Sequence, residues 1–550
     1  MLVKTSPDFD VVIVGGGHNG LVTGAYLAGS GLRVLLLEQR ETIGGLCTTA
    51  ELFPGMRGNL VANSAHNFEP KVLSDLRLDQ HGLTWSEPLR PSSFIMFPDG
   101  RRVVSWPNKE DVRKEFDRFA PGDYDAQMKL NDELMQLAIT LDVDFFGPPP
   151  SFAEVAARPK TPAQEELFTK VMFGSATDLV REHLVSEELQ SSLAMLAATG
   201  NFLGPASPGS AFQLMHRALY RGSSAVRNRP KISASAEFAS RVPIGGMGAI
   251  TQALASAFLA RGGQIRTASA VETIKVGPNG VEGVVLAGGE EINARIVASA
   301  INPKTTLIDL VPQEALQPDI RSAFSGIGMA GCMAKVHVAL NDLPQFVCAT
   351  DQAENELLAR CGFRVGLTQD AMQRSFEAAT HGDWSGDPII YGLVQTAVDP
   401  TLAPEGRHVM SLSVSYAPYH LAEGTWETVG DDWAKHVLRS LAPHISNFDQ
   451  IVDDYRFLTP DDLENQFGLL EGHALHGNIT ASRAFNWRPV AGFSDYRAPV
   501  RGLYFCSNGT WPALYVSGLA GHNAAQEIER DIADQIHGTF DPAIFDEGIQ

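Results

Sequence analysis

Cysteine is scarce in this chain, and the spacing of the few that occur excludes several kinds of chemistry. The 550 residues contain five cysteines, and no two of them lie closer than 13 positions apart. This spacing excludes a CxxC redox motif, a thiolate zinc site and the CxxxxC centre of flavin disulfide reductases. The sequence therefore predicts isolated, buried thiols in a reducing compartment.

Long apolar runs and an excess of positive charge are also absent. The longest apolar stretch, residues 11–37, is interrupted by glycines, His18, Asn19 and Arg33, which indicates a protein core and not a membrane span. The first ten residues show no apolar segment typical of a secretory signal, so we expect a cytoplasmic protein. The formal net charge of −21 disfavours nucleic acid as a partner and broad attraction to anionic lipid. HExxH, GxSxG and Walker motifs do not occur.

The most informative feature that is present is a glycine-rich turn between a predicted strand and a predicted helix. An apolar run at 11–14 ends at Gly15, an amphipathic helix begins near Gly20, and a second strand ends on Glu38. In such a turn Gly15 permits the tight bend, Gly17 lets the backbone approach a diphosphate, and Gly20 lets helix and strand pack closely. The helix N-terminus can bind phosphate, and Glu38 can accept hydrogen bonds from a ribose. The sequence therefore predicts a dinucleotide site.

The residues after Glu38 favour FAD over NAD as the dinucleotide. Arg40 is followed by the pair Gly44-Gly45, which brings a guanidinium group and bare backbone to the far side of the same diphosphate. This extension is typical of large flavoproteins related to glutathione reductase, and NAD dehydrogenases lack it. A second strand–GxGxxG–helix unit does not occur, so we expect no bound NADPH.

The rest of the chain alternates between strand-forming and helix-forming segments. The runs SSFIMF and RRVVSW flank the turn sequence PDG and predict a β-hairpin. Apolar residues spaced three and four apart over 109–219 predict a helical insertion that forms a cap over a cleft. Period-two segments within 311–484, such as MAKVHVAL, predict an antiparallel sheet with one face on a cavity or core.

Four segments resemble one known family. They are VVIVGGGHNGLVTGAYLAGSGLRVLLLEQRETIGG, PIGGMGAITQALASAFLARGGQIRTASAV, INPKTTLIDLV, and HGNIT with the later RPVAGFSDYRAPVRGLYFCSNGT and VSGLAGHNAA. They resemble the phytoene desaturase group of FAD-dependent oxidoreductases, which includes carotenoid isomerases and retinol saturases. Within it they are most similar to the branch named for pyridine nucleotide-disulfide oxidoreductase domain-containing protein 2.

This resemblance implies an α/β fold with a discontinuous, Rossmann-like FAD domain of the glutathione reductase type, a mixed-sheet substrate domain and a helical cap. The implied boundaries are 1–90, 235–310 and 485–550 for the FAD domain, 91–234 for the hairpin and cap, and 311–484 for the substrate domain.

The resemblance also implies further FAD-binding residues. The backbone of Val271 would contact the adenine side, and Asn508 would reach the ribityl chain. The turn at Val516 and Ser517 would open the last helix, whose N-terminus can stabilise negative charge on the flavin ring. Turn capping is the alternative role for Asn508 and Ser517.

The sequence departs from its relatives next to that turn. Many relatives carry Thr-His-Pro followed by a glycine tract, whereas this chain has Trp511 and Tyr515 there. Both are predicted substrate contacts, which would favour an apolar substrate shorter than a rod-like carotenoid. Packing of the two rings against the cap is the alternative.

The catalytic candidates are His66, His476 and Tyr515, because polar groups near the flavin could act as a base after hydride removal. A structural hydrogen-bonding role is the alternative for each histidine. His473 and His476 are three residues apart, but no carboxylate-rich partner motif accompanies them, so we expect no metal.

The main hypothesis is an FAD-dependent dehydrogenase or desaturase that transfers hydride from a hydrophobic, isoprenoid or terpenoid substrate to FAD N5. A flavin amine oxidase-like enzyme and an FAD-bound, non-catalytic subunit of a redox complex are the alternatives. Oxygen, a quinone or a carrier protein is left open as the electron acceptor. Peripheral membrane contact through the insertion and an oligomeric state are left open as well.

Overall fold

The first sheet of the molecule is assembled from three segments that lie far apart in the sequence. The computed structural model describes residues 7–227, 241–331 and 333–537. Parallel strands run in the order β7 (Gln264–Arg266), β2 (Val34–Leu37), β1 (Phe9–Val14), β10 (Glu291–Ser299) and β16 (Leu503–Phe505). This is a Rossmann-like order, and it confirms the predicted fold class.

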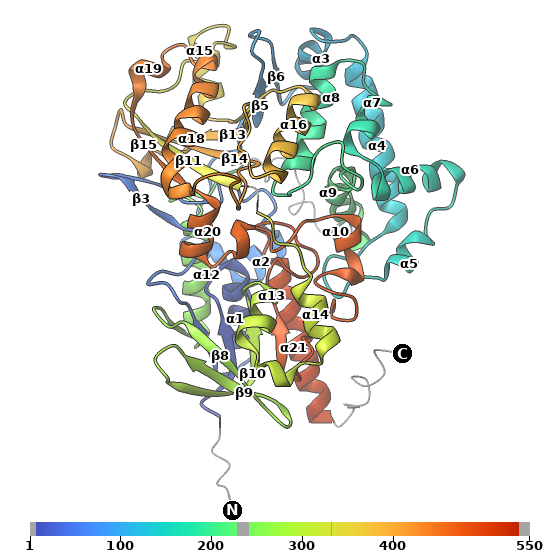
Figure 1. Cartoon of the computed structure of the whole chain (residues 1–550), viewed down its shortest axis with the longest axis vertical. Helices are drawn as coiled ribbons and strands as arrows, with labels where there is room; N and C mark the ends of the chain where they lie inside the picture. Colours follow the sequence, from blue (N-terminus) through green and yellow to red (C-terminus); the bar gives the residue numbers. More distant parts are fainter. Residues whose placement is uncertain (1–6, 228–240, 332, 538–550) are drawn as a thin grey trace, which may run out of the picture.

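Both faces of this sheet are covered, which explains the uninterrupted apolar run of β1. Val11 and Ile13 pack toward α1 (His18–Gly29), α12 (Gly248–Ala260) and α21 (Leu519–His537). Val12 and Val14 pack on the opposite side with residues of β8 (Val271–Gly277) and β9 (Gly280–Leu286). Those two strands form an antiparallel meander with the first half of β10, as the lower part of Figure 1 shows. A strand buried on both faces has no polar alternation.

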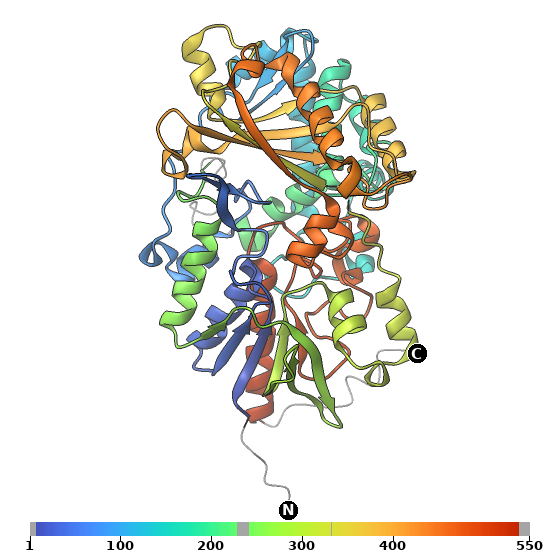
Figure 2. The ribbon, with the colours of Figure 1, turned by 60° about the vertical axis from the view of Figure 1, so that its left-hand side comes forward.

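A second sheet lies above the first domain in the views of Figures 1 and 2. Its strand order is β15 (Val452–Leu458), β11 (Met333–Leu340), β14 (His408–Ser415), β13 (Ile389–Val394), β12 (Gly362–Val365), β5 (Ser93–Met96) and β6 (Arg102–Val104). The expected hairpin is present as β5 and β6. It does not join the helical cap, as the sequence analysis grouped it, because β5 pairs in parallel with β12 and so extends the second sheet.

The two faces of the second sheet differ in character. Along β11, Ala334, Val336 and Val338 pack into an apolar core with α18 (Trp426–Leu441). The alternate residues Lys335 and His337 point to the other face, and both are buried. Period-two patterning therefore separates a structural face from a polar one.

The predicted helical insertion is present and forms its own apolar core. Its helices are α3 (Lys109–Asp117), α4 (Asp123–Leu141), α5 (Phe152–Ala156), α6 (Pro162–Phe173), α7 (Ala176–Arg181), α8 (Glu187–Ala194), α9 (Phe212–Gly222) and α10 (Ser224–Arg227). Residues of α4, α6 and α9 share a core with the C-terminal segment that contains Trp511 and Leu514. The cap is thus packed against the segment that precedes α21. The predicted boundary at 234/235 lies outside the described residues.

The remaining elements connect and cover these layers. They are β3 (Thr49–Phe53), β4 (Met56–Asn59), α2 (Pro70–Leu76), α13 (Pro303–Thr305), α14 (Pro318–Ser325), α15 (Gln352–Ala359), α16 (Gln369–Thr380), α17 (Gln395–Val398), α19 (Phe448–Ile451) and α20 (Pro460–Phe467), with short 3₁₀ turns between them. Four cysteines are free thiols, and Cys332 lies outside the described residues. Within the described ranges, no helix combines the length and the apolar character needed to cross a bilayer.

Candidate functional site: a dinucleotide turn beneath a capped cavity

The glycine-rich turn is tight everywhere except at Gly17. Gly15 has φ +102°, and a Cβ there would lie 2.9 Å from the Ile301 side chain. A Cβ on Gly20 would lie 2.2 Å from the carbonyl oxygen of Gly15. A Cβ on Gly17 would meet no described atom within 4 Å. The turn therefore exposes bare backbone at one residue, which the N-terminus of α1 follows directly.

Glu38 is held in place at the end of β2. Its Oε2 accepts a hydrogen bond from the Gly16 N–H at 2.8 Å, and its Oε1 accepts one from the Arg40 N–H at 2.9 Å. The residue is buried, at 6% exposure. Each carboxylate oxygen retains a further acceptor position, so Glu38 can also bind the hydroxyls of a ribose.

The Gly44-Gly45 pair lies directly on the glycine-rich turn. The Gly44 N–H donates to the Gly16 carbonyl at 2.9 Å, and a Cβ on Gly45 would lie 3.3 Å from the Gly17 Cα. Their φ angles, +120° and +54°, lie in the region that favours glycine. Two bare backbone stretches therefore face the same space, which is the arrangement that a diphosphate requires.

Arg40 carries a buried donor that the described part of the protein does not satisfy. Its Nη1 has no hydrogen-bond partner there, and its guanidinium group lies 4.6 Å from the centre of the Phe467 ring. Burial lowers the pKa of Arg40. A half-buried guanidinium with an unpaired, buried Nη1 beside bare backbone fits an anionic cofactor group.

The segment that leads into Val271 runs beside Glu38 and Arg40. The Ala268 N–H donates to the Arg40 carbonyl at 2.8 Å, and the Ser269 N–H donates to the Glu38 carbonyl at 2.9 Å. Val271 is the first residue of β8. Val271 thus lies at the ribose end of the site. The resemblance of the chain to its relatives implies an adenine contact there.

Two helix N-termini converge at the other end of the site. A Cβ on Gly521 of α21 would lie 2.3 Å from the Asn19 carbonyl of α1, and the Thr23 hydroxyl donates to the Gly521 carbonyl at 3.0 Å. Ser517 caps α21, because its Oγ accepts from the Leu519 N–H at 3.2 Å. The positive ends of both helix dipoles therefore face one region.

The other two C-terminal candidates differ in what they offer. Val516 is half-buried and packs against the core beneath the first sheet. The Asn508 carbonyl accepts from Arg488 Nε at 3.1 Å and Nη2 at 2.7 Å, whereas its side chain has no hydrogen bond among the described residues. The Asn508 amide is therefore available to a ligand.

His18 belongs to this site, although the sequence analysis did not select it. It is the first residue of α1, hydrogen-bonds the backbone of Tyr515, and has a buried Nε2 without a partner in the described ranges. Burial lowers its pKa to about 4, so the ring is neutral at pH 7. Its position inside the GGGHNG turn was the signal that could have identified it.

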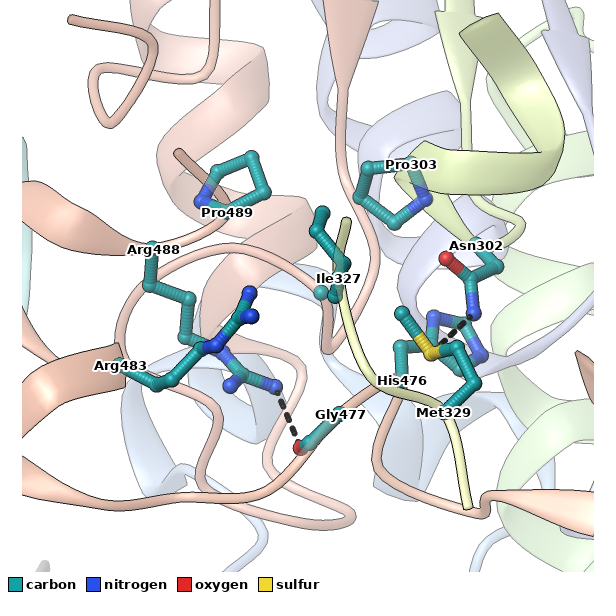
Figure 3. Close-up of a pocket in the computed structure, with 10 residues that line it drawn as sticks. Asn302, Pro303, Ile327, Met329, His476, Gly477, Arg483, Arg488 and Pro489 are labelled. Carbon is teal, nitrogen blue, oxygen red and sulfur yellow. Dashed lines mark hydrogen bonds between the residues drawn. The ribbon is translucent and has the colours of Figure 1, made fainter. Parts of the chain in front are cut away.

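His476 lies on a pocket between the first domain and the C-terminal segment (Figure 3). Its Nδ1 lies 3.2 Å from Ser507 Oγ, and burial, together with Arg488, lowers its pKa to about 3. Figure 3 shows Arg483 and Arg488 side by side across this pocket, with an Arg488 hydrogen bond to the Gly477 carbonyl. The charge of His18 also lowers the pKa of His476, so the two rings are neighbours.

His66 lies apart from His476, toward the cap. Arg217 Nη2 donates to His66 Nε2 at 3.2 Å, so Nε2 is unprotonated and the Nδ1–H faces Ser64 Oγ. Burial and the charges of Arg217, Arg364 and Arg221 lower the pKa of His66 to about 3. The lone pair on His66 Nε2 therefore already accepts a hydrogen bond from Arg217.

The two aromatic candidates separate into a core residue and a cavity residue. Trp511 is 1% exposed, stacks on Phe485 at 5.4 Å between ring centroids, and donates its indole N–H to the Asp144 carbonyl. The structure thus packs Trp511 against the cap. Tyr515 lines a cavity beneath the cap, and its hydroxyl donates to the Thr199 carbonyl at 3.0 Å.

That cavity is bordered by α9 and by the turn before α21. The residues that line it are Leu196, Thr199, Gln213, Leu214, His216, Arg217 and Tyr515. It therefore combines two apolar side chains, Leu196 and Leu214, with a mainly polar lining that includes one cationic side chain. Because Tyr515 directly precedes Val516 and Ser517, the cavity lies next to the converging helix N-termini.

The polar face of the second sheet carries two buried titratable residues that the sequence did not single out. Lys335 is fully buried and donates to Ser413 Oγ at 2.9 Å, and burial lowers its pKa to about 7. His337 hydrogen-bonds the Leu60 carbonyl at 3.1 Å, which joins this face to the segment after β4. The polar residues within a predicted strand were the available signal.

The site fits FAD in four respects. The turn is open at Gly17, Arg40 has an unpaired donor, Glu38 is held in place, and two helix N-termini converge. Within the described ranges, no group of three or more metal-ligating side chains occurs. A flavin held in this way, beside a capped cavity, defines an FAD-dependent oxidoreductase.

Comparison with known proteins agrees with this class. The family of flavin-containing amine oxidoreductases matches residues 20–345, and the chain belongs to this family. It is 32% identical to pyridine nucleotide-disulfide oxidoreductase domain-containing protein 2 of Rattus norvegicus, over 96% of this chain and 94% of the relative. The predicted resemblance is thereby confirmed.

More distant relatives and solved structures extend the comparison. A limonene dehydrogenase component of Castellaniella defragrans is 25% identical over 96% of both chains. A neurosporene-forming phytoene desaturase of Cereibacter sphaeroides is 22% identical over 94% of both chains. Among solved structures, putrescine oxidase aligns with a TM-score of 0.59 at 18% identity, over 96% of this chain and 99% of that one. This last likeness shows the shared fold.

Proposed function

We propose that the protein is an FAD-dependent dehydrogenase that oxidises a C–H bond of a hydrophobic substrate of isoprenoid or terpenoid type. The observation that carries the proposal is the cavity beneath the cap, where Tyr515 connects to the flavin-binding turn and Leu196 and Leu214 supply the apolar part of a mainly polar lining. The full-length similarity to a limonene dehydrogenase component and to a phytoene desaturase supports this substrate class.

We assign the FAD-binding roles from the glycine-rich motif and the family resemblance, and the positions of the residues support the assignment. Gly15, Gly17 and Gly20 form the diphosphate turn, with Arg40, Gly44 and Gly45 on its far side. Glu38 binds the ribose, and the backbone at Val271 approaches the adenine. Asn508 reaches the ribityl chain, and Val516 and Ser517 present the N-terminus of α21 to the flavin ring. When bound, FAD accepts two electrons and one proton from the substrate.

The second proton of the substrate needs an acceptor on the protein. His66 and His476 have pKa values lowered to about 3, and Arg217 already occupies the free lone pair of His66. Both rings therefore serve better as neutral hydrogen-bonding groups. Lys335, whose pKa is lowered to about 7, is a stronger candidate for the base, because a neutral amine is substantially populated near pH 7. Tyr515 serves as a substrate contact.

An amine oxidase is the second candidate, and the family match and the putrescine oxidase fold favour it. Two observations count against it. Trp511 is packed in the cap core, so it cannot complete an aromatic cage with Tyr515. The cavity is lined by Arg217, whose charge acts on Arg364, so both guanidinium groups repel an ammonium group.

Anaerobic titration of the FAD-loaded protein tests the proposal. Limonene and other terpenoids are compared with putrescine and cyclohexylamine, and bleaching of the flavin absorbance is recorded. We expect bleaching by a terpenoid, with Lys335→Met at least tenfold slower at unchanged FAD content. Bleaching by amines alone would establish the amine oxidase candidate. Absence of bleaching by every compound would favour the non-catalytic subunit. Mixing the reduced protein with oxygen, a quinone or a carrier protein then identifies the acceptor.

A further inference from the structure

Three arginine side chains from two parts of the molecule gather around His66. Arg217 and Arg221 are four residues apart on α9, so they lie on one face of that helix. Arg364 comes from β12 of the second sheet and lies 5.5 Å from the centre of the Tyr391 ring. Arg217 reaches His66 at 3.2 Å, and the charges of all three arginines act on that histidine. We refer to Arg217, Arg221 and Arg364 as the arginine cluster.

The arginine cluster has no counter-ion in the described part of the chain. The charges that act on Arg364 are those of Tyr391 and Arg217, and the charges that act on Arg221 are those of Arg217 and Tyr220. No aspartate or glutamate of the described residues pairs with any of the three. Burial and the mutual repulsion with Arg217 lower the pKa values of Arg364 and Arg221. Arg217 and Arg364 are half-buried and Arg221 is exposed, so the cluster borders solvent. Bringing like charges together at a partly buried site is unfavourable unless an anion joins them.

The position of the arginine cluster shows which ligand could supply that anion. Arg217 lines the cavity beneath the cap together with Leu196, Leu214 and Tyr515. A ligand in this cavity would therefore place an apolar body against the leucines and its end against the guanidinium groups. The FAD diphosphate has a separate site at Gly17 and Arg40, so it does not satisfy this cluster.

We propose that the substrate carries an anionic oxygen group, a carboxylate or a phosphate, which the arginine cluster binds. The inference rests on the proposed function, because it takes the cavity beneath the cap as the substrate site. Guanidinium groups bind both carboxylate and phosphate through paired N–H donors. His66 then acts as a positioning residue, since its neutral ring accepts a hydrogen bond from Arg217 and directs that side chain.

Binding of saturated probes to the FAD-loaded protein tests this proposal without turnover. Decanoate, decyl phosphate, 1-decanol and decylamine share one apolar chain and differ in the end group. Calorimetry gives each dissociation constant, and the shift of the visible flavin spectrum reports occupancy next to the flavin. We expect decanoate or decyl phosphate to bind about tenfold or more tightly than decanol and decylamine. The tighter of the two anions identifies the end group.

Arg364→Gln and Arg217→Gln should each weaken the anionic probe by about 10- to 100-fold and leave decanol unchanged. Arg181→Gln is the matched control, because Arg181 lies on the cap and faces Asp370 at 3.7 Å. The proposal is overturned if decanol binds as tightly as both anions, or if neither cluster variant changes anion binding. It is also overturned if the variants lose FAD instead, which would assign the cluster to the cofactor. Anion binding without any substrate oxidation would refute the dehydrogenase proposal and leave this one standing.

Discussion

Arg102, which is buried, and Arg364, which is half-buried, belong to the same sheet and have opposite electrostatic surroundings. Arg102 lies on β6 at the edge of the sheet and forms a bidentate pair with Glu354, with Glu115 at 3.6 Å. Burial alone would lower its pKa, but the two carboxylates outweigh burial and raise it. Arg364 lies on β12, two strands further in, and has no carboxylate partner in the described part of the chain; burial and Arg217 lower its pKa.

The difference separates a group that stabilises the fold from a group that serves a ligand. A buried cation with its own carboxylates completes a closed network, whose loss destabilises the protein. A buried cation without them raises the free energy of the unliganded fold and makes a favourable contact only when an anion arrives. The same contrast applies to Lys335, which is fully buried with a hydroxyl partner alone.

Acidification should have the largest effect on the protein, because it lowers the stability of a fold that buries several neutral histidines. The buried rings of His18, His66, His216, His337, His473 and His476 have pKa values lowered to between about 3 and about 4. Since these lie below the unfolded value of about 6.5, the unfolded chain binds more protons as the pH falls. Their contribution to stability is present above pH 6.5 and is lost toward pH 3, at up to about 1.4 kcal/mol per pH unit for each ring.

Unfolding temperatures between pH 8 and pH 5 measure this loss. His66→Gln keeps an acceptor for Arg217 and should flatten the pH dependence by one ring, whereas His381→Gln, at the surface, should not. A pH dependence that is the same in His66→Gln and the parent protein would contradict the assignment of a neutral ring beside the arginine cluster.

Glu354→Gln should destabilise the protein by about 1.5 to 3 kcal/mol, because it removes the bidentate carboxylate partner of the buried Arg102 and leaves only Glu115, at 3.6 Å. Arg364→Gln removes a charge that is already unpaired, so it should leave the stability of the FAD-free protein unchanged or raise it. Thermal unfolding of both variants measures the difference. Equal losses of stability would show that Arg364 has a structural counter-ion and would remove the contrast between the two arginines.

Lys335→Met should stabilise the protein at pH 7 by about 2 to 3 kcal/mol after the loss of the Ser413 hydrogen bond. The pKa of Lys335 falls from its usual 10.5 to about 7 in the folded state, so the unfolded chain binds an extra proton between these values. The gain should therefore shrink as the pH rises toward 10.5. Unfolding temperatures of the variant and the parent at pH 7 and pH 10 test it, and a destabilised variant at pH 7 would contradict a dry, uncompensated lysine.

The FAD site could be predicted from the sequence because its residues lie close together along the chain. Gly15, Gly17, Gly20 and Glu38 sit within one strand–turn–helix–strand unit, and their local order determines their geometry. The arginine cluster could not be predicted in this way. Arg217 lies 151 residues after His66, and Arg364 lies a further 147 residues along the chain. They meet only because β12 pairs with β5 and α9 packs in the core of the cap.

Packing decides the cases in which a residue type allows two roles. Trp511 could have faced either a substrate or the cap, and its neighbours Phe145 and Phe485 decide for the cap. The hairpin was recognised from its turn, but its place in the second sheet depends on β12, which lies some 260 residues further along. Local patterns thus predict elements, whereas long-range pairing decides which unit they join.

Gly17→Val should have the smallest effect on stability and a decisive effect on FAD. Its Cβ meets no described atom within 4 Å and its φ of −72° suits any residue, so stability should change by no more than about 0.5 kcal/mol. The added side chain would fill the space that the diphosphate needs, and we expect a folded, colourless protein with FAD affinity reduced at least 100-fold. Gly288→Val, in the open turn between β9 and β10, is the matched control and should stay yellow.

Gly20→Val should instead prevent correct folding of the turn, because its Cβ would lie 2.2 Å from the Gly15 carbonyl. A yellow Gly17→Val protein would show that the diphosphate lies elsewhere. Gly17 would then no longer be an example of a residue that serves a ligand and not the stability of the fold.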